Sequence, residues 1–98
     1  MFYMICVDQA TNDELNAIQA IVKENAHGWW HHFTSIWIVG GHNASFWRDQ
    51  ATPLLTSPSS SVLVVRLPQT GERYWSYFGI ETEKRLDWLN KNLRSDSA

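Results

Sequence analysis

The clearest candidate for chemistry is Asp8, a single carboxylate that ends the apolar run of residues 2–7. Carboxylate oxygens are ligands that Mg²⁺ prefers, and a bound Mg²⁺ can activate a water against a phosphodiester. If a second copy of the chain brings two Asp8 carboxylates together, the pair would form a site for Mg²⁺ or Mn²⁺. The alternative is that Asp8 caps the loop that follows it, as Asp commonly does in turns.

Four histidines lie close together in the sequence, and each is a candidate ligand or proton carrier at neutral pH: His27, His31, His32 and His42. His27 and His31 have the spacing of metal ligands on a helix, but Gly28 is expected to break that helix. In a strand, His31 and His32 point to opposite faces, so only one of them can join a given site. We take His31 as the candidate general base or acid. The alternative is that these histidines are surface or core-edge residues.

Aromatic and basic residues suggest a second kind of site, in which rings stack on bases and guanidinium groups bind phosphate. The candidates are Trp29, Trp75, Arg66 and Arg73. Trp29 and Trp75 flank predicted turns, where a ring can stay accessible. Tryptophans within strands more often pack in a core with the indole N–H bonded to backbone, and we expect that role for Trp30 and Trp37.

The composition excludes several classes of protein. Eight Lys and Arg against ten Asp and Glu give a net charge of −2, which argues against a large phosphate-tracking surface. Cys6 is the only cysteine, so an internal disulfide and a cysteine-based zinc site are excluded. No Gly-rich phosphate loop or Ser-His-Asp arrangement is present. No apolar run approaches the roughly 20 residues that span a bilayer, and residues 1–7 are too short for a signal peptide, so we expect a cytoplasmic protein without a membrane partner.

The elements that must position these residues alternate between strands and helices. Short apolar or aromatic runs predict four strands, at 2–7, 29–33, 36–40 and 62–67. The middle two are expected to form a tight hairpin that turns at Thr34 and Ser35. A turn is predicted at 68–71, and the aromatic stretch 74–79 is ambiguous.

The first predicted helix has the strongest local signal. Thr11 and Glu14 have the spacing of a capping box, in which each side chain bonds the backbone N–H of the other residue. Apolar residues then follow at helical spacing: Leu15, Ile18, Ile21 and Val22. Gly28 is expected to end this helix, because glycine tolerates a left-handed conformation.

Two more helices are predicted further along the chain. The second is capped by Asn43 or Ser45 and ends within a turn of Pro53, which cannot continue a helix. The third is a polar helix over about 82–93, with a thin stripe of leucines on one side.

The order of these elements predicts the fold. A β-α-β-β-α-β chain with short right-handed crossovers closes most simply into a four-stranded antiparallel sheet with both helices on one face. The expectation is therefore an α+β, ferredoxin-like sandwich, a single domain over 1–98 with an added C-terminal helix.

Both faces of that sheet are predicted to be apolar, because adjacent residues of 2–7 and 62–67 point to opposite faces and nearly all are apolar. Two helices cover only one face, and an exposed apolar face of roughly a few hundred Å² would cost several kcal/mol. We therefore predict a two-fold homodimer. The alternative is a monomer in which the C-terminal helix and residues 74–78 fold over the sheet.

Three segments carry a resemblance to known proteins: Phe-Tyr-Met-Ile-Cys-Val-Asp at 2–8, Gly-Trp-Trp-His-His-Phe-Thr-Ser-Ile-Trp-Ile-Val at 28–39 and Asp-Trp-Leu-Asn-Lys-Asn-Leu at 87–93. They are similar to the CRISPR-associated small endoribonucleases and the VapD-type toxin ribonucleases, often labelled SinR-like. The Trp-Trp-His hairpin is the distinctive motif. The resemblance implies a ferredoxin-like homodimer in which an Asp at the end of the first strand of each subunit holds a divalent metal. The matching position here is Asp8.

Two hypotheses of function follow. The first is a homodimeric, nucleic-acid-related protein of this type, which cleaves RNA with a divalent metal held by Asp8. The second is a non-catalytic module of the same fold that binds a nucleotide or a protein partner in phage–host defence or counter-defence, through a dimer groove lined by Trp and Arg. The two differ in whether they depend on Asp8.

Overall fold

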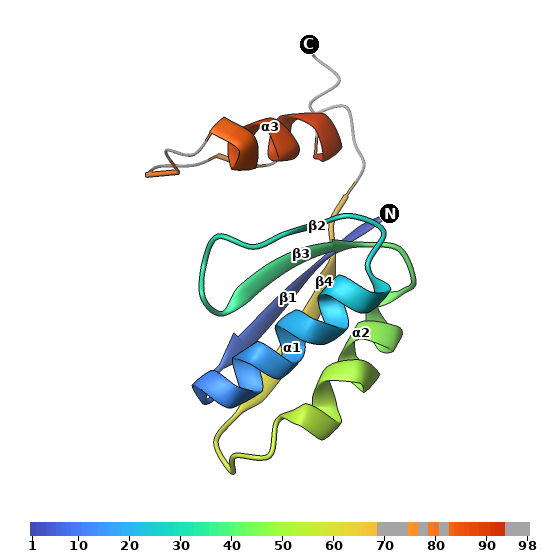
Figure 1. The fold of residues 1–98 in the computed structure, drawn as a ribbon. Coiled ribbons are helices and arrows are strands. Elements are labelled where there is room, and N and C mark those ends of the chain that lie inside the picture. Colours follow the sequence, from blue (N-terminus) through green and yellow to red (C-terminus); the bar gives the residue numbers. More distant parts are fainter. Residues whose placement is uncertain (69–74, 77–78, 81–82, 94–98) are drawn as a thin grey trace. The chain divides into compact units, whose positions relative to one another are not determined.

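The computed structural model (Figure 1) describes residues 1–68, 75–76, 79–80 and 83–93. The chain divides into two compact units, Met1–Leu67 and Pro68–Ala98. The first unit holds a sheet and two α-helices, and the second holds the helix α3 (Glu83–Asn92). The expectation of one domain over the whole chain stays a prediction. Across the described ranges, no helix is long and apolar enough to cross a membrane.

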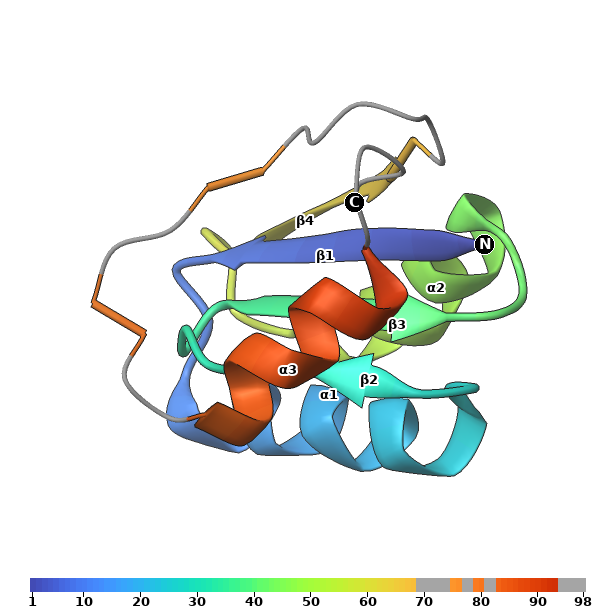
Figure 2. The ribbon, with the colours of Figure 1, turned by 90° about the horizontal axis from the view of Figure 1, so that it is seen from above.

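Four strands of the first unit form one antiparallel sheet in the order β2-β3-β1-β4, which Figure 2 shows from above. The strands are β1 (Phe2–Asp8), β2 (Trp29–Trp30), β3 (Ile36–Gly40) and β4 (Ser61–Arg66). The central strand β1 pairs with β3 on one side and with β4 on the other. The predicted α+β class and the four-stranded antiparallel sheet are therefore confirmed.

Helices α1 (Asn12–Asn25) and α2 (Ala44–Ala51) lie on the same side of the sheet (Figure 1), which we call the helix face. Alternate residues of β1 are buried on this face: Tyr3, Ile5 and Val7. They form one cluster with buried side chains of both helices and of β3: Ile18, Val22, Trp37, Val39 and Trp47. The indole N–H of Trp37 donates to Gln19 Oε1 at 2.6 Å, so this fully buried ring leaves no unpaired donor.

The opposite side of the sheet, which we call the outer face, is apolar as well, as the sequence predicts. Two cross-strand rows form it, Ile38–Met4–Val65 and Ile36–Cys6–Leu63. Leu63 is 62% exposed and Val65 is 39% exposed, so the outer face is most open along β4. The two covers expected for this face, a second copy and the C-terminal segment, stay predictions.

Helix α1 begins as predicted and ends earlier than predicted. The Glu14 N–H donates to Thr11 Oγ1 at 3.2 Å and the Thr11 N–H donates to Glu14 Oε1 at 2.7 Å, so the capping box is confirmed. The last helical residue is Asn25, and Ala26 is already extended. Gly28 does adopt a positive φ of 88°, but there it turns the chain into β2, so its prediction as the helix stop was wrong.

Glu14 also fastens α1 to the loop before β4. Its Oε2 accepts from the Ser57 N–H at 2.9 Å, and its Oε1 accepts from the Ser57 hydroxyl at 2.7 Å. The carboxylate is buried. The hydrogen bonds from Thr11 and Ser57 outweigh the effect of burial and lower the Glu14 pKa from 4.5 to about 2. The ionised carboxylate is therefore the form that the fold stabilises.

The first strand of the β2–β3 hairpin is shorter than predicted. The strand expected over 29–33 covers only Trp29–Trp30. The turn expected at Thr34 and Ser35 is present, closed by a hydrogen bond from the Ile36 N–H to the Phe33 carbonyl at 3.3 Å. Beyond Trp30 the pairing with β3 ends, and the His31 ring stacks on Trp37.

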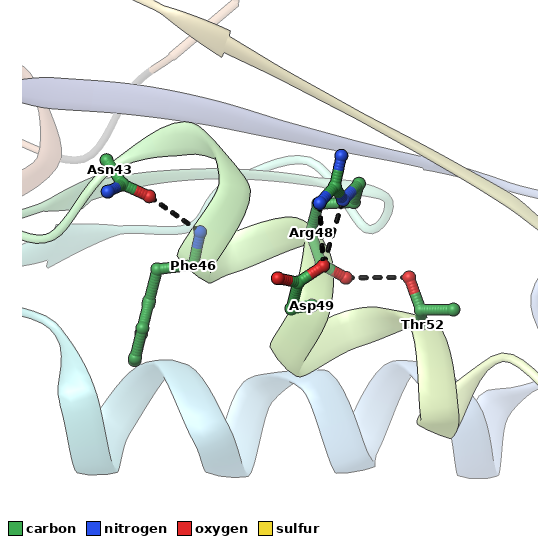
Figure 3. Close-up of polar contacts among 5 residues, drawn as sticks. All are labelled: Asn43, Phe46, Arg48, Asp49 and Thr52. Atoms are coloured by element: carbon green, nitrogen blue, oxygen red, sulfur yellow. Dashed lines mark hydrogen bonds and ion pairs between the residues drawn. The ribbon is translucent and has the colours of Figure 1, made fainter.

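Asn43 caps helix α2, since its Oδ1 accepts from the Phe46 N–H at 2.8 Å (Figure 3). Of the two caps that the sequence left open, Asn43 and Ser45, the structure has the first. A short 3-10 helix, η1 (Thr52–Leu54), follows directly and contains Pro53. The prediction that Pro53 ends the helix is confirmed, because proline has no N–H for the preceding turn.

Helix α3 falls within the range predicted for the third helix, 82–93. The turn predicted at 68–71 and the ambiguous stretch 74–79 lie largely outside the described residues.

The contacts of Glu14 predict an acid-sensitive stability. Because the folded-state pKa lies below the ordinary value of 4.5, ionised Glu14 stabilises the fold fully above about pH 4.5, and this stabilisation is lost as the pH falls toward 2. Glu14→Gln should lower the melting temperature at pH 7 and flatten its decline between pH 4.5 and 2, measured by circular dichroism. The control is Glu24→Gln, an exposed carboxylate on the same helix. Equal behaviour of the two variants would contradict the role of Glu14.

Candidate functional site

Asp8 is the exposed last residue of β1 and lies opposite Ser61 of β4. Since side chains alternate along a strand, Asp8 belongs to the outer face, with Met4 and Cys6. Within the described part of the chain, no hydrogen bond or ion pair involves its carboxylate. The N-cap of α1 is Thr11, and the alternative that Asp8 caps the loop between β1 and α1 stays a prediction. Gln9 follows with a φ of 54°, a left-handed conformation that is uncommon for residues other than glycine.

One chain does not supply a complete metal centre among the described residues. These residues contain no group of three or more His, Cys, Asp and Glu side chains that would hold an ion. Burial raises the pKa of the Cys6 thiol, which disfavours the thiolate that binds metals. A cation at Asp8 would therefore take its remaining ligands from water or from a second copy of the chain.

His31, the other predicted catalytic residue, is placed elsewhere. Its ring stacks on Trp37 with the centroids 4.4 Å apart and the planes 16° apart. Its Nε2 lies 3.3 Å from the Thr34 carbonyl oxygen. Trp37 is a helix-face residue opposite Ile5 in the middle of β1, whereas Asp8 lies at the end of β1 on the outer face. The structure therefore does not bring His31 to Asp8.

The structure instead brings together His27 and His42, whose ring centroids are 5.5 Å apart. His42 stacks on Phe46 at 3.8 Å, and its Nε2 lies 3.0 Å from the Asn25 carbonyl oxygen. Because a carbonyl only accepts, Nε2 donates this hydrogen bond, and it satisfies a carbonyl at the end of α1. The His27–His31 pairing considered from the sequence is not the pairing that forms.

The paired glycines before His42 were the sequence signal for this contact. A side chain at Gly40 would collide with the His27 carbonyl oxygen, and a Cβ at Gly41 would lie 2.8 Å from His27 Nδ1. Only glycine leaves room for His27 at these two positions, and Gly41 also has a φ of 88°.

The predicted nucleotide site is dispersed. Trp29 and Arg66 occupy opposite ends of one row across the sheet, Trp29–Val39–Tyr3–Arg66. Three strand spacings separate them, roughly 14 Å, which is too far for one pocket around a base and its phosphate. Trp29 is half-buried against the core, and Arg66 is exposed. The packing expected for Trp30 and Trp37 is confirmed, since both are buried.

The other two candidates of that site belong to the second unit. The Trp75 indole N–H donates to the Leu93 carbonyl at the end of α3. Arg73 lies outside the described residues.

A shallow groove runs between α2 and β4, at the edge of the sheet. It is lined by Ala44, Ser45, Arg48, Val62, Leu63 and Val64. Arg48 pairs with Asp49 at 2.9 Å, and its carbonyl accepts from the Thr52 hydroxyl at 2.7 Å (Figure 3). Its charge is therefore already partly neutralised by Asp49.

No protein-family model matches this chain, and no curated protein sequence matches it. The resemblance to the CRISPR-associated small endoribonucleases and VapD-type ribonucleases therefore stays a prediction from the residues.

The stacking of His31 on Trp37 predicts that this histidine contributes to the stability of the fold. His31→Ala removes the ring that stacks on Trp37 and should cost about 1 kcal/mol of unfolding free energy, measured by urea denaturation. His31→Phe keeps a stacked ring and should retain most of the stability. If His31→Phe destabilises the protein as much as His31→Ala, stacking is not the contribution of this residue.

Proposed function

We propose that this chain acts as a ferredoxin-like homodimer that holds Mg²⁺ or Mn²⁺ between two Asp8 carboxylates and uses it to cleave RNA. In this proposal the two copies pack through the outer faces of their sheets. The proposal includes a cytoplasmic location and a relationship to the CRISPR-associated small endoribonucleases and VapD-type ribonucleases.

The observation that carries the proposal is the position of Asp8 at one end of the apolar outer face, exposed and without a partner among the described residues. A second copy that covers Met4 and Cys6 would bring its own Asp8 to the same end of the interface when the two-fold axis passes near the ends of the β1 strands. Two carboxylates at the rim of an apolar contact repel each other. A divalent cation between them removes that repulsion.

In the proposed chemistry, the Asp8 carboxylates are the only side chains that the protein supplies to the cation. A divalent cation at this place would supply an activated water and neutralise charge that develops on the phosphodiester. The Asp8 carboxylates would hold the cation and orient its waters. His31, on the helix face, has no part in this step.

The sheet order supports the ferredoxin-like assignment. In β2-β3-β1-β4, the strands joined by α1, β1 and β2, are separated by β3. The strands joined by α2, β3 and β4, are separated by β1. Two interleaved β-α-β units with antiparallel neighbours are the arrangement that we assign to this fold.

A second candidate is a non-catalytic module that binds a nucleotide or a protein partner. The net charge of −2 favours it, since RNA binding usually depends on basic side chains that contact phosphate. Ligand binding that is lost in Arg66→Ala, a change of an exposed cation, but kept in Asp8→Ala would support the module.

The metal site is tested by titration with Mn²⁺, followed by electron paramagnetic resonance. The native protein should bind one Mn²⁺ per two chains, and Asp8→Asn should weaken binding by roughly 100-fold or more, because a direct ligand is lost. Asp13→Asn, which changes an exposed carboxylate in the first turn of α1, is the matched control and should bind normally.

The same two variants test the activity. Cleavage of a labelled single-stranded RNA should require the metal, stop with EDTA, and be lost in Asp8→Asn but not in Asp13→Asn. Cleavage that survives both EDTA and Asp8→Asn would overturn the metal-dependent mechanism.

A further inference from the structure

Strand β4 ends the sheet, and among the described residues only β1 lies beside it. The Leu67 N–H donates to the Phe2 carbonyl at 2.8 Å, which fixes the side to which each backbone group points. Because N–H and C=O groups alternate sides along a strand, Val65, Leu63 and Ser61 face β1. The backbone groups of the three residues between them, Val62, Val64 and Arg66, point out of the sheet.

This edge has few of the features that normally keep edge strands apart. Ser61–Arg66 contains no proline, lysine or acidic residue, and its one charged residue, Arg66, lies at the end of the strand, after a centre of Val-Leu-Val-Val. Two of its apolar side chains, Leu63 and Val65, are exposed on the outer face. A strand with this composition, whose outward backbone groups have no partner among the described residues, is a template for another strand.

We propose that β4 pairs antiparallel with β4 of a second copy of this chain, with Val64 on the two-fold axis. In a continued sheet, directly opposed residues have side chains on the same face, which limits the register. Only the register centred on Val64 pairs all three outward-facing residues within the strand. Val64 then faces the partner's Val64, and Val62 faces the partner's Arg66. Each pair exchanges both N–H···O bonds.

The side chains favour a second copy as the occupant. In this register Leu63 lies directly opposite the partner's Val65, so the two exposed apolar residues of β4 cover each other. The row Ile36–Cys6–Leu63 then continues into the partner's Val65 and Met4, and the apolar outer face extends across both copies. On the helix face, Ala44 and Ser45 of α2 are small and leave the groove beside Val64 open.

This edge contact does not depend on the proposed function. It uses the backbone of β4, whereas the proposed metal site uses the outer face at Asp8, and each can fail without the other. If both contacts form, the molecule has two self-complementary interfaces and assembles beyond a dimer.

Disulfide cross-linking tests the register. In a Cys6→Ala background, Leu63→Cys protein is mixed with Val65→Cys protein and oxidised. The Leu63 and Val65 positions form a non-hydrogen-bonded pair with Cα atoms about 4.5 Å apart, within the range that a disulfide bridges. The mixture should give a covalent dimer on a non-reducing gel. Either protein alone should give little, because identical positions are offset by two residues.

Two results would overturn the proposal: a mixture that does not cross-link although its thiols react with a maleimide, and single proteins that cross-link as well as the mixture. Chain mass by light scattering gives a second measurement. Val64→Pro removes an N–H that points away from β1, so it should keep a cooperative thermal transition while raising the dissociation constant of the edge contact by roughly tenfold or more. A concentration-independent mass of one chain in the native protein would also exclude the contact.

Discussion

The structure depends on β1, a central strand that is apolar on both faces and bonded to a neighbour on both sides. Its odd-numbered residues, Tyr3, Ile5 and Val7, meet α1 and α2, and its even-numbered residues form the middle of the outer face. A shift of one residue in its register would exchange the two faces. The fixed register places Asp8 on the outer face at the end of the strand, and the candidate metal site follows from that placement.

Because the residues of β1 alternate between the two faces, both faces of the sheet are apolar. The helix face is buried by α1 and α2, whereas the outer face keeps exposed apolar residues along β4. The helix face receives Ile18, Val22 and Trp47 from two helices, and each of these is fully buried. Along β4, by contrast, Leu63 and Val65 remain exposed. Leu63 and Val65 belong both to the outer face and to the edge strand, so one short segment contributes to both self-contacts that we propose.

Features set by nearby residues were predictable from the sequence. The capping box of Thr11 and Glu14, the helix stop at Pro53 and the apolar strands each depend on a few adjacent side chains. Errors arose where contacts outside the local pattern accompany the end of an element. His31 stacks on Trp37 where β2 has ended, and His42, seventeen residues from Asn25, bonds the Asn25 carbonyl where α1 ends. The position of Asp8 depends only on its own strand and could be predicted. The separation of Trp29 from Arg66 depends on the order of all four strands in the sheet.

The close approach of His27 to Gly40 and Gly41 restricts how this chain can change during evolution. Because any larger residue at Gly40 would strike a backbone carbonyl rather than a movable side chain, no rotamer change can relieve the collision. At Gly41 the positive φ adds a second barrier. Substitutions at Gly40 and Gly41 are therefore excluded as long as His27, which follows α1, packs against them. We expect both glycines to be kept in related sequences whose surface residues have changed.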